Sequence, residues 1–276
     1  MPNETNQKPP VKQSPQPSLA TRGSPDHAVR PVTVLAQRCP GGQGQAHQHP
    51  KHHQLIYAIA GVIRVVTSEG VWVVPPQRAV WVPAGTEHRV DAARSFDLCT
   101  LYVAFRHRSG WPTSCQVVGV PELLRELLRR AAAFGDQTPV SAPESRLLEV
   151  LLDQISGLDV LGLQLLMPQD RRILRVAQAL QAEPGLRTTL AEWGRAVGAS
   201  ARTLDRLFQF ETGMNFSSWR GQARLMAALE ALGTGQSVTE VALTVGYDDV
   251  SSFITMFKRA MGTTPRAYFK GLGGVS

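Results

Sequence analysis

Histidines gather in one short part of the sequence. Four of the seven histidines stand within seven consecutive residues, and two of them, His47 and His49, are separated by a single residue. On a β-strand, residues two apart point to the same side, so both imidazoles would face one site. His88 follows later in the chain, and neutral imidazoles are good ligands for Zn, Ni, Cu or Fe. These three histidines predict a divalent transition-metal site, completed by His53 or Gln54. The alternative is that the histidines are satisfied by hydrogen bonds or line a polar pocket.

Residues typical of β-strands surround this cluster. Residues 31–115 are rich in β-branched and aromatic side chains, and glycine and proline interrupt them at short intervals. Short strands at this spacing predict a small β-barrel or jelly roll. Tyr57, Trp72 and Trp81 belong to these strands, and an apolar lining with a few polar groups is typical of small-molecule sites. These three rings are therefore candidates for the wall of an effector pocket.

The spacing of glycines and histidines in this region follows two motifs. The first is matched by Gly41, His47, His49, Gln54 and Gly61, and the centre of the second by Pro83, Gly85 and His88. Residues 31–115 thereby resemble a cupin barrel. In cupins the two histidines, a glutamate and the later histidine bind a divalent metal, which the resemblance implies for the matching positions here.

The sequence departs from the cupin motifs at three positions. Gln54 stands where a glutamate is usual, Gln77 where the second motif opens with a glycine, and Ala92 where it closes with an asparagine. Regulators that resemble this family often use the same barrel to hold a small organic effector without metal. Both a metal and a small molecule therefore remain candidate effectors.

Two helical patterns follow the strands. Residues 121–134 begin with a proline, which is common at a first helical position, and residues 144–155 repeat the same apolar spacing. Residues 158–167 are too apolar to be left in water. The wide apolar stripe of the second segment must cover the barrel or another subunit. Residues 116–169 are therefore predicted to form a helical linker that also dimerises the protein.

One sequence pattern occurs twice between residues 189 and 262. Each copy begins with a capping box, formed by Thr189 with Glu192 and by Ser237 with Glu240. In each copy a glycine follows the first helix and supplies a left-handed turn before a second helix. Each copy therefore predicts a helix–turn–helix unit, whereas the simpler alternative is a plain helical bundle.

The second helix of each copy has a polar outward face. These outward residues are Arg202, Asp205, Arg206 and Gln209 in the first copy, and Ser251, Ser252, Thr255, Lys258 and Arg259 in the second. The chain carries a net charge of +7, and residues 170–276 hold 13 Lys and Arg against 9 Asp and Glu. Such a charge suits a nucleic-acid partner. Two helix–turn–helix units with polar faces in a basic chain predict a protein that reads DNA.

The segment between the two units and the second unit itself carry a further pattern. It consists of Trp219, Arg224 and Ala228, followed by Gly246, Tyr247, Ser251, Phe253, Phe257, Gly262 and Pro265. With these residues, the stretch 170–270 resembles the DNA-binding domain of the AraC/XylS family of bacterial transcription regulators. The resemblance implies that both second helices enter successive major grooves on one face of the DNA.

The same resemblance assigns roles to the outward residues. By position, the residues that contact bases would be Arg202, Asp205 and Arg206 in the first unit, and Ser251, Ser252 and Thr255 in the second. Lys258 and Arg259 suit phosphate groups. Thr255 stands where the family often has arginine, and Val250 where it often has a polar residue. We therefore predict that the first unit carries most of the sequence readout and that the second mainly anchors the protein.

These patterns together predict a two-domain α+β protein. It comprises a disordered tail at residues 1–30, a cupin-like barrel at 31–115, a helical linker at 116–169 and an all-α domain with two helix–turn–helix units at 170–276. The predicted function is control of transcription at promoter DNA, without enzymatic activity, by a homodimer that also meets RNA polymerase and responds to a small-molecule or metal effector. The residues leave open whether the protein is an activator or a repressor.

The remaining features bear on location and on competing functions. No apolar leader and no run of 18 apolar residues occurs, and the three cysteines lack metal-type or redox spacing. We therefore expect a cytoplasmic protein that contacts no membrane. The competing hypotheses are a metal-dependent cupin enzyme with a helical interaction module, and a nucleoid-type binder without sequence preference.

Overall fold

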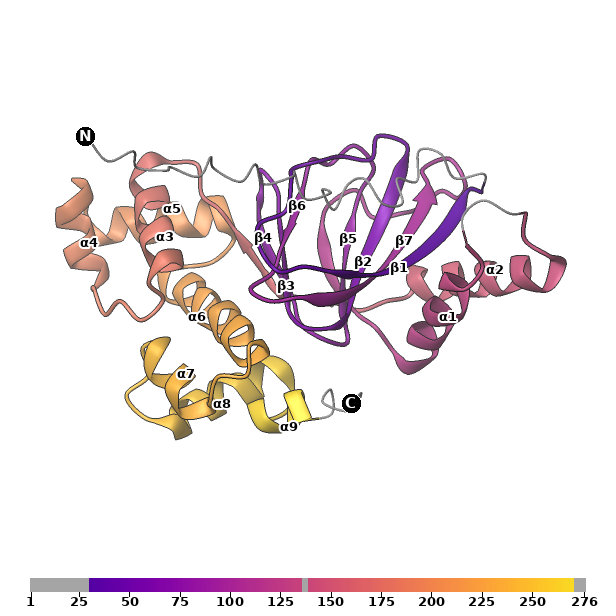
Figure 1. Ribbon diagram of the computed structural model, residues 1–276. Coiled ribbons are helices and arrows are strands. Elements are labelled where there is room, and N and C mark those ends of the chain that lie inside the picture. The colour runs from indigo at the N-terminus through magenta and orange to yellow at the C-terminus, as the bar shows by residue number, and fades with distance from the viewer. Residues whose placement is uncertain (1–29, 136–138, 271–276) are drawn as a thin grey trace, which may run out of the picture.

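The computed structural model describes residues 30–135 and 139–270, and the predicted disordered tail lies outside this part apart from Arg30. The chain folds into an N-terminal domain rich in sheet and a C-terminal domain of helices, which confirms the predicted fold class. Figure 1 shows the sheets in the middle of the molecule, with one helical pair on one side and the C-terminal helices on the other. The two domains are in contact, so the sheets are covered from both sides.

Strands account for the N-terminal domain. They are β1 (Val32–Cys39), β2 (His52–Ala60), β3 (Ile63–Val66), β4 (Gly70–Val74), β5 (Arg78–Val82), β6 (Arg89–Asp91), β7 (Phe96–Ala104), β8 (Gln116–Gly119), β9 (Val160–Leu161) and β10 (Gln164–Leu166). Within the described residues they form a larger sheet in the order β1-β7-β2-β5-β8-β9 and a smaller sheet in the order β10-β4-β3-β6. All pairings are antiparallel. The sheets do not close into a barrel, and the arrangement is compatible with the jelly roll that was the other form of the prediction.

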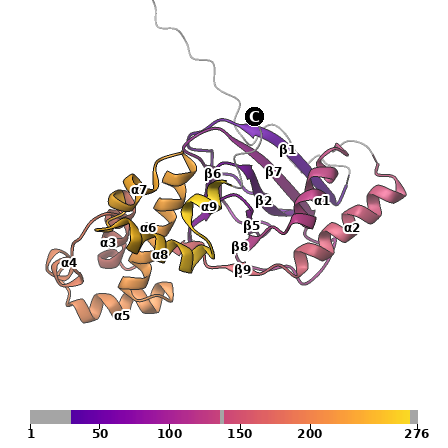
Figure 2. The same cartoon turned by 90° about the horizontal axis from the view of Figure 1, so that it is seen from below.

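The larger sheet has two apolar faces because its strands are buried on both sides. Leu55 and Tyr57 of β2 belong to a buried cluster with α1 (Glu122–Ala132) and α2 (Ala142–Ser156). Ile56 and Ala58 alternate with them and pack into the cluster that contains the smaller sheet. We call these the outer face and the inner face. Figure 2 shows α1 and α2 beside the larger sheet, opposite the C-terminal helices.

Two short strands occupy a segment for which helix was expected. β9 pairs with β8 and extends the larger sheet, whereas β10 pairs with β4 and extends the smaller one. Leu163 and Leu165 are buried there, so the apolar segment is covered by sheet edges. The predicted helical linker at 116–169 thus contains α1 and α2 but also the strands β8, β9 and β10, which the prediction did not include. Strands of two to four residues are too short to show a period in the sequence.

The C-terminal domain contains both predicted helix–turn–helix units. Its helices are α3 (Arg171–Ala182), α4 (Leu190–Val197), α5 (Ala201–Thr212), α6 (Phe216–Gly233), α7 (Val238–Thr244), α8 (Val250–Met261) and α9 (Pro265–Lys270). Both capping boxes form, with Thr189 and Ser237 each accepting from the glutamate three residues later. Gly198 has a φ of 70°, in the left-handed region that the turn before α5 requires. α4–α5 and α7–α8 are thus the two units, and α6 joins them.

Helix α6 holds both units and also contacts the sheets. Phe208 of α5 packs on Trp219 of α6 with ring centroids 5.5 Å apart, and Arg224 of α6 lies over the Tyr247 ring at 5.7 Å. The Trp219 Nε1 donates to the Leu166 carbonyl of β10 at 3.0 Å. One buried apolar cluster runs from the inner face of the larger sheet through the smaller sheet into the helical domain. The helix that positions both units is therefore packed directly on the sheet domain.

Candidate DNA-binding face and histidine cluster

Two arginines dominate the outward face of α5. The helix begins at a Ser200 cap, whose Oγ accepts from the Thr203 N–H at 3.1 Å. Arg202 and Arg206 are exposed one helical turn apart, and neither has a side-chain partner within the described residues. Because a free guanidinium can bind guanine through two hydrogen bonds, these side chains can serve base recognition.

Asp205 and Gln209, which were predicted to contact DNA with these arginines, instead bind the protein itself. The Asp205 Oδ1 accepts from the Phe216 N–H at 2.9 Å, at the first residue of α6. The Gln209 Nε2 donates to the Gly213 carbonyl at 3.0 Å. Both bonds join α5 to the turn that leads into α6. We therefore reassign Asp205 from base contact to positioning, whereas the exposed Gln209 keeps only part of its hydrogen-bonding capacity for DNA.

Phe210 is an exposed aromatic residue that sequence reasoning missed. It follows Arg206 by four residues on α5, and 86% of its surface is exposed. Phe208, two residues earlier, is fully buried. An aromatic residue four positions after an outward arginine on a helix lies near the same face, and this spacing was the signal available in the sequence. The apolar ring extends the arginine face of α5.

The polar residues of α8 are largely engaged within the helix. The Asp249 Oδ1 accepts from the Ser252 N–H at 2.8 Å, and its Oδ2 accepts from the Ser252 hydroxyl at 2.7 Å. The Thr255 hydroxyl donates to the Ser251 carbonyl at 2.9 Å. These bonds engage the hydroxyls of the exposed Ser252 and Thr255, whereas the exposed Ser251 contributes only its backbone carbonyl to them.

The last turn of α8 supplies positive charge. Lys258 and Arg259 are exposed there, and no ion pair involves either of them in the described part of the chain. Flexible cations at a helix end suit phosphate oxygens better than base edges. The exposed cations of α5 thus lie in its first half and those of α8 in its last turn, and the division of reading and anchoring between the two units stays a prediction.

The histidine cluster is formed by backbone pairing between two distant segments. The His47 N–H donates to the His88 carbonyl at 2.9 Å, and the His88 N–H donates to the His47 carbonyl at 2.8 Å. Their ring centroids lie 4.4 Å apart, and the His49 ring lies 5.2 Å from His47 and 5.9 Å from His88. One potential ligand nitrogen from each of the three lies within 4.8 Å of the others. His47 and His49 lie outside the named strands, and an isolated bridge pairs His47 with His88.

Backbone carbonyls select one tautomer for two of these histidines. The Nδ1 of His47 lies 3.0 Å from the Gln45 carbonyl, and the Nδ1 of His88 lies 3.0 Å from the Thr86 carbonyl. A carbonyl can only accept, so each Nδ1 carries the proton and each Nε2 keeps its lone pair. Burial lowers the pKa of His88 to about 4, with an opposing contribution from the Thr86 hydrogen bond and a further decrease from His47. His88 is therefore neutral near pH 7, as a metal ligand must be.

His53 and Gln54 take different positions around this cluster. His53 does not join it, because its Nδ1 accepts from the Ala84 N–H at 3.2 Å and its ring stacks on Trp81 at 5.2 Å. The Gln54 side chain is on the inner face, where its Nε2 donates to the Tyr102 hydroxyl at 3.3 Å. The Tyr102 ring in turn meets His49 edge-on at 5.0 Å. The predicted group of five is thus reduced to three histidines with Gln54 nearby.

The three aromatic residues proposed for an effector pocket do not share one site. Tyr57 and Trp81 are on the outer face, packed with α1 and α2, and the Trp81 Nε1 donates to the Pro112 carbonyl at 3.1 Å. Trp72 belongs to the inner cluster of the sandwich. Sequence alternation could separate the faces of each strand, but it could not show that helices would cover the outer face.

The inner face holds polar groups that the sequence analysis missed. Thr33 and Thr100 alternate with outer-face residues of β1 and β7, and their buried hydroxyls have no hydrogen-bond partner within residues 30–135 and 139–270. The same is true of the Trp72 Nε1, the Gln54 Oε1 and the His88 Nε2. Buried polar atoms are normally paired, so a group of them in one interior indicates a ligand or ordered water. Single threonines within apolar strands were the available signal.

Comparison with known proteins agrees with both halves of this arrangement. Residues 193–271 match a helix-turn-helix domain family, and residues 36–104 match the cupin domain family. The HTH-type transcriptional regulator NimR of Escherichia coli (strain K12) is 35% identical over 230 residues, which cover 83% of this chain and 84% of that protein. The chain belongs to the AraC/XylS family of transcription regulators. As a member it is a DNA-binding transcription regulator with a cupin domain.

Other family members and structures show similarity over different lengths. The HTH-type transcriptional regulator RipA of Corynebacterium glutamicum is 38% identical over 109 residues, or 40% of this chain and 33% of that protein. A crystal structure of ToxT from Vibrio cholerae strain SCE256 covers 89% of this chain and 97% of its own, at 13% identity and a TM-score of 0.38. Among the helices that the structure describes, none is both long and apolar enough to cross a bilayer.

Proposed function

We propose that this AraC/XylS regulator binds its promoter through α5 and α8 and that an effector held by the histidine cluster controls this binding. The observation that carries the proposal is the convergence of His47, His49 and His88 inside a domain packed on α6. An effector at this cluster would bind the domain on which α6 packs, and α6 joins both helix–turn–helix units. One buried apolar cluster runs from the sheet domain that holds the histidines into the helical domain that carries the DNA-binding face.

The histidine cluster fits a divalent transition metal. His47 and His88 keep their Nε2 lone pairs, and the His88 Nε2 is buried without a partner among the described residues. Hydrogen bonds from the opposite ring nitrogens to carbonyls are the usual outer support of metal-bound histidines. Three imidazoles suit Zn, Ni, Cu or Fe and disfavour Mg or Ca. When bound, such a metal would be a Lewis acid, and its coordination by both histidines would link the His47 segment to the His88 segment.

A small polar molecule is the second candidate effector, and a separate observation favours it. The Thr33 and Thr100 hydroxyls on the inner face and the Trp72 Nε1 of the smaller sheet are buried without partners in the described chain. These groups could donate to or accept from an organic ligand next to the histidines. The two effectors are compatible, because a metal at the histidines leaves these groups to a molecule beside it.

The mechanism would be a shift between two arrangements of the domains. Arg64 of β3 and Trp219 of α6 each make a hydrogen bond across the interface between the sheets and the helical domain. An effector that binds one arrangement more tightly shifts the population toward it, and only this difference in affinity can alter DNA binding. We further propose that the protein acts as a homodimer in a bacterial cytoplasm and contacts RNA polymerase. The named relatives are regulators, which favours this function over a cupin enzyme.

Metal analysis of the purified full chain tests the effector site. Wild type should contain a transition metal, His88→Ala should lose it, and His53→Ala should keep it because His53 lies outside the cluster. The affinity for a DNA fragment from upstream of the chain's own gene is then measured with and without a chelator. If chelator changes the DNA affinity of wild type but not that of His88→Ala, the result supports control by metal. Metal-free protein with DNA affinity unaffected by chelator would exclude the metal and leave the organic effector.

A further inference from the structure

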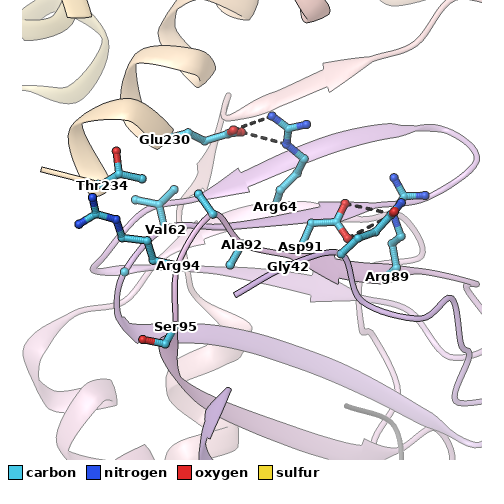
Figure 3. A pocket seen from close by; sticks show the side chains of 14 residues that line it. Gly42, Val62, Arg64, Arg89, Asp91, Ala92, Arg94, Ser95, Glu230 and Thr234 are labelled. Atoms are coloured by element: carbon cyan, nitrogen blue, oxygen red, sulfur yellow. Dashed lines mark hydrogen bonds and ion pairs between the residues drawn. The ribbon is translucent and has the colours of Figure 1, made fainter. Parts of the chain in front are cut away.

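A cleft lies between the smaller sheet and the end of α6. Its volume is about 650 Å³. Figure 3 shows Val62, Arg64 and Arg94 of the sheet domain around it, together with Glu230 and Thr234 from α6 and its cap. None of the clustered histidines lines this cleft. A cavity of this size, formed by two domains, is typical in volume and position of small-molecule sites.

A bidentate ion pair bridges the two sides of the cleft. The Arg64 Nε donates to the Glu230 Oε1 at 3.0 Å, and its Nη2 donates to Oε2 at 2.5 Å. The side chains remain 43% and 27% exposed, so water reaches both groups. An exposed pair contributes little net stability, and another carboxylate could replace Glu230 on Arg64 at small cost.

A second acid in the cleft is already neutralised. The Asp91 Oδ2 accepts from the Arg89 Nε at 3.0 Å, and its Oδ1 accepts from the Gly44 N–H at 3.1 Å. Asp91 therefore fixes the wall of the cleft and does not compensate a further cation.

Arg94 supplies the uncompensated charge. It is exposed at the cleft, and its guanidinium has no hydrogen bond or ion pair within the part of the chain that the structure describes. With Arg64 and Arg89 paired to Glu230 and Asp91, the cleft keeps one net positive charge. The C-terminal end of α6 does not cancel this positive charge with free carbonyl groups. The Glu230 and Leu232 carbonyls already accept hydrogen bonds from the Thr234 and Gly235 N–H groups. The electrostatics of the cleft thus favour an anion.

We propose that this cleft binds a small organic acid, which Arg94 holds through one carboxylate and which competes with Glu230 for Arg64. Arginine binds carboxylates through two parallel hydrogen bonds, and two such sites recognise a molecule with two acidic groups. Inorganic phosphate would fill only a small part of the volume, so an organic ligand fits better. Release of Glu230 from Arg64 would loosen α6 from the smaller sheet. This effect on DNA rests on the proposed function, whereas binding itself does not.

Titration calorimetry of the full chain with succinate tests the binding site. At about 10 mM succinate, a weak ligand should still give measurable heat with wild type. Arg94→Gln should lower the affinity about tenfold, whereas Glu230→Gln should raise it severalfold by removing the competitor. Arg38→Gln is the matched control, because this exposed arginine of the same domain lies outside the cleft. Arg94 is exposed, so its variant should fold normally.

Three results would overturn the proposal. Wild type could show no heat with succinate, Arg94→Gln could bind it as well as wild type does, or inorganic phosphate could bind as tightly as succinate. The effect of succinate on DNA affinity is a separate measurement. If succinate binds in an Arg94-dependent way but DNA affinity stays constant, the site stands and its coupling to DNA fails. Failure to bind the promoter both with and without succinate would count against the proposed function, and the calorimetric result for the cleft would be unaffected.

Discussion

Arg206 and Thr255 occupy equivalent places on the two second helices, but their side chains differ in the number of free hydrogen-bond donors. Arg206 presents an exposed guanidinium without a partner in the described chain, whereas the Thr255 hydroxyl already donates to the Ser251 carbonyl. The hydrogen-bond donors of the first unit are therefore available to DNA, whereas much of the hydrogen-bonding capacity of the second unit is used within its own helix.

We expect Arg206→Ala to weaken binding to the cognate promoter about tenfold or more, since a bidentate contact to guanine contributes roughly 1–3 kcal/mol of discrimination. Thr255→Ala should cost much less, because its hydroxyl is engaged inside α8. Fluorescence anisotropy with cognate and random DNA measures both. Equal losses for the two variants would show that the second unit reads the sequence as much as the first.

Phe210 should affect binding without affecting stability. Its ring is 86% exposed, so Phe210→Ala removes little buried surface and should leave the free energy of unfolding unchanged. We expect this variant to lose severalfold affinity for a promoter with a thymine methyl at the contacted position, because aromatic rings make apolar contacts with that group. Phe208→Ala is the contrast, as loss of this fully buried ring should cost about 3–5 kcal/mol of stability. Unchanged promoter affinity in Phe210→Ala would exclude Phe210 from the interface.

At the level of elements, the capping boxes make the helical domain sensitive to acid. Hydrogen bonds from Thr189 lower the pKa of Glu192, and those from Ser237 lower the pKa of Glu240, both from an ordinary 4.5. A carboxylate with a lowered pKa in the folded state stabilises the fold above pH 4.5, and this contribution disappears as pH falls through the lowered value. Unfolding of Glu192→Gln/Glu240→Gln should therefore depend less on pH than that of wild type between about pH 5 and 3. If the free energy of unfolding of wild type and of the double variant changed with pH in parallel, the capping boxes would make no such contribution.

The elements that the sequence predicted are those whose signals are local. The capping boxes and the turn at Gly198 involve residues a few positions apart, so both helix–turn–helix units were correct. β9 and β10 were missed because pairing with β8 and β4 creates them, and no local period does. His47 and His88 were correctly grouped through family motifs, but the backbone bridge that joins them is a long-range contact. His53 was misplaced because the face of β2 that it occupies depends on where the chain enters the strand.

For the whole molecule, the central question is how the sheet domain is coupled to the DNA-binding helices. Apolar packing of α6 on β4 and β10 holds the domains together, and the Trp219 and Tyr268 side chains donate hydrogen bonds to carbonyls of the sheet domain at 3.0 and 2.7 Å. The Arg64–Glu230 ion pair adds a charged contact to this interface. Because this pair is partly hydrated, a ligand or a mutation can change it without unfolding either domain.

A charge swap across this interface measures that coupling. Arg64→Glu and Glu230→Arg should each lower the free energy of unfolding, because each places two like charges together. The double variant should recover most of the loss by restoring a pair, giving a coupling of about 0.5–1 kcal/mol for side chains this exposed. Chemical denaturation of the four proteins gives the coupling, and promoter affinity measured on the same four shows whether the pair also sets the position of the helix–turn–helix units. Additive losses in stability would mean that the pair does not link the domains. Recovery of stability without recovery of promoter affinity would mean that DNA binding depends on the orientation of the pair and not only on its charge.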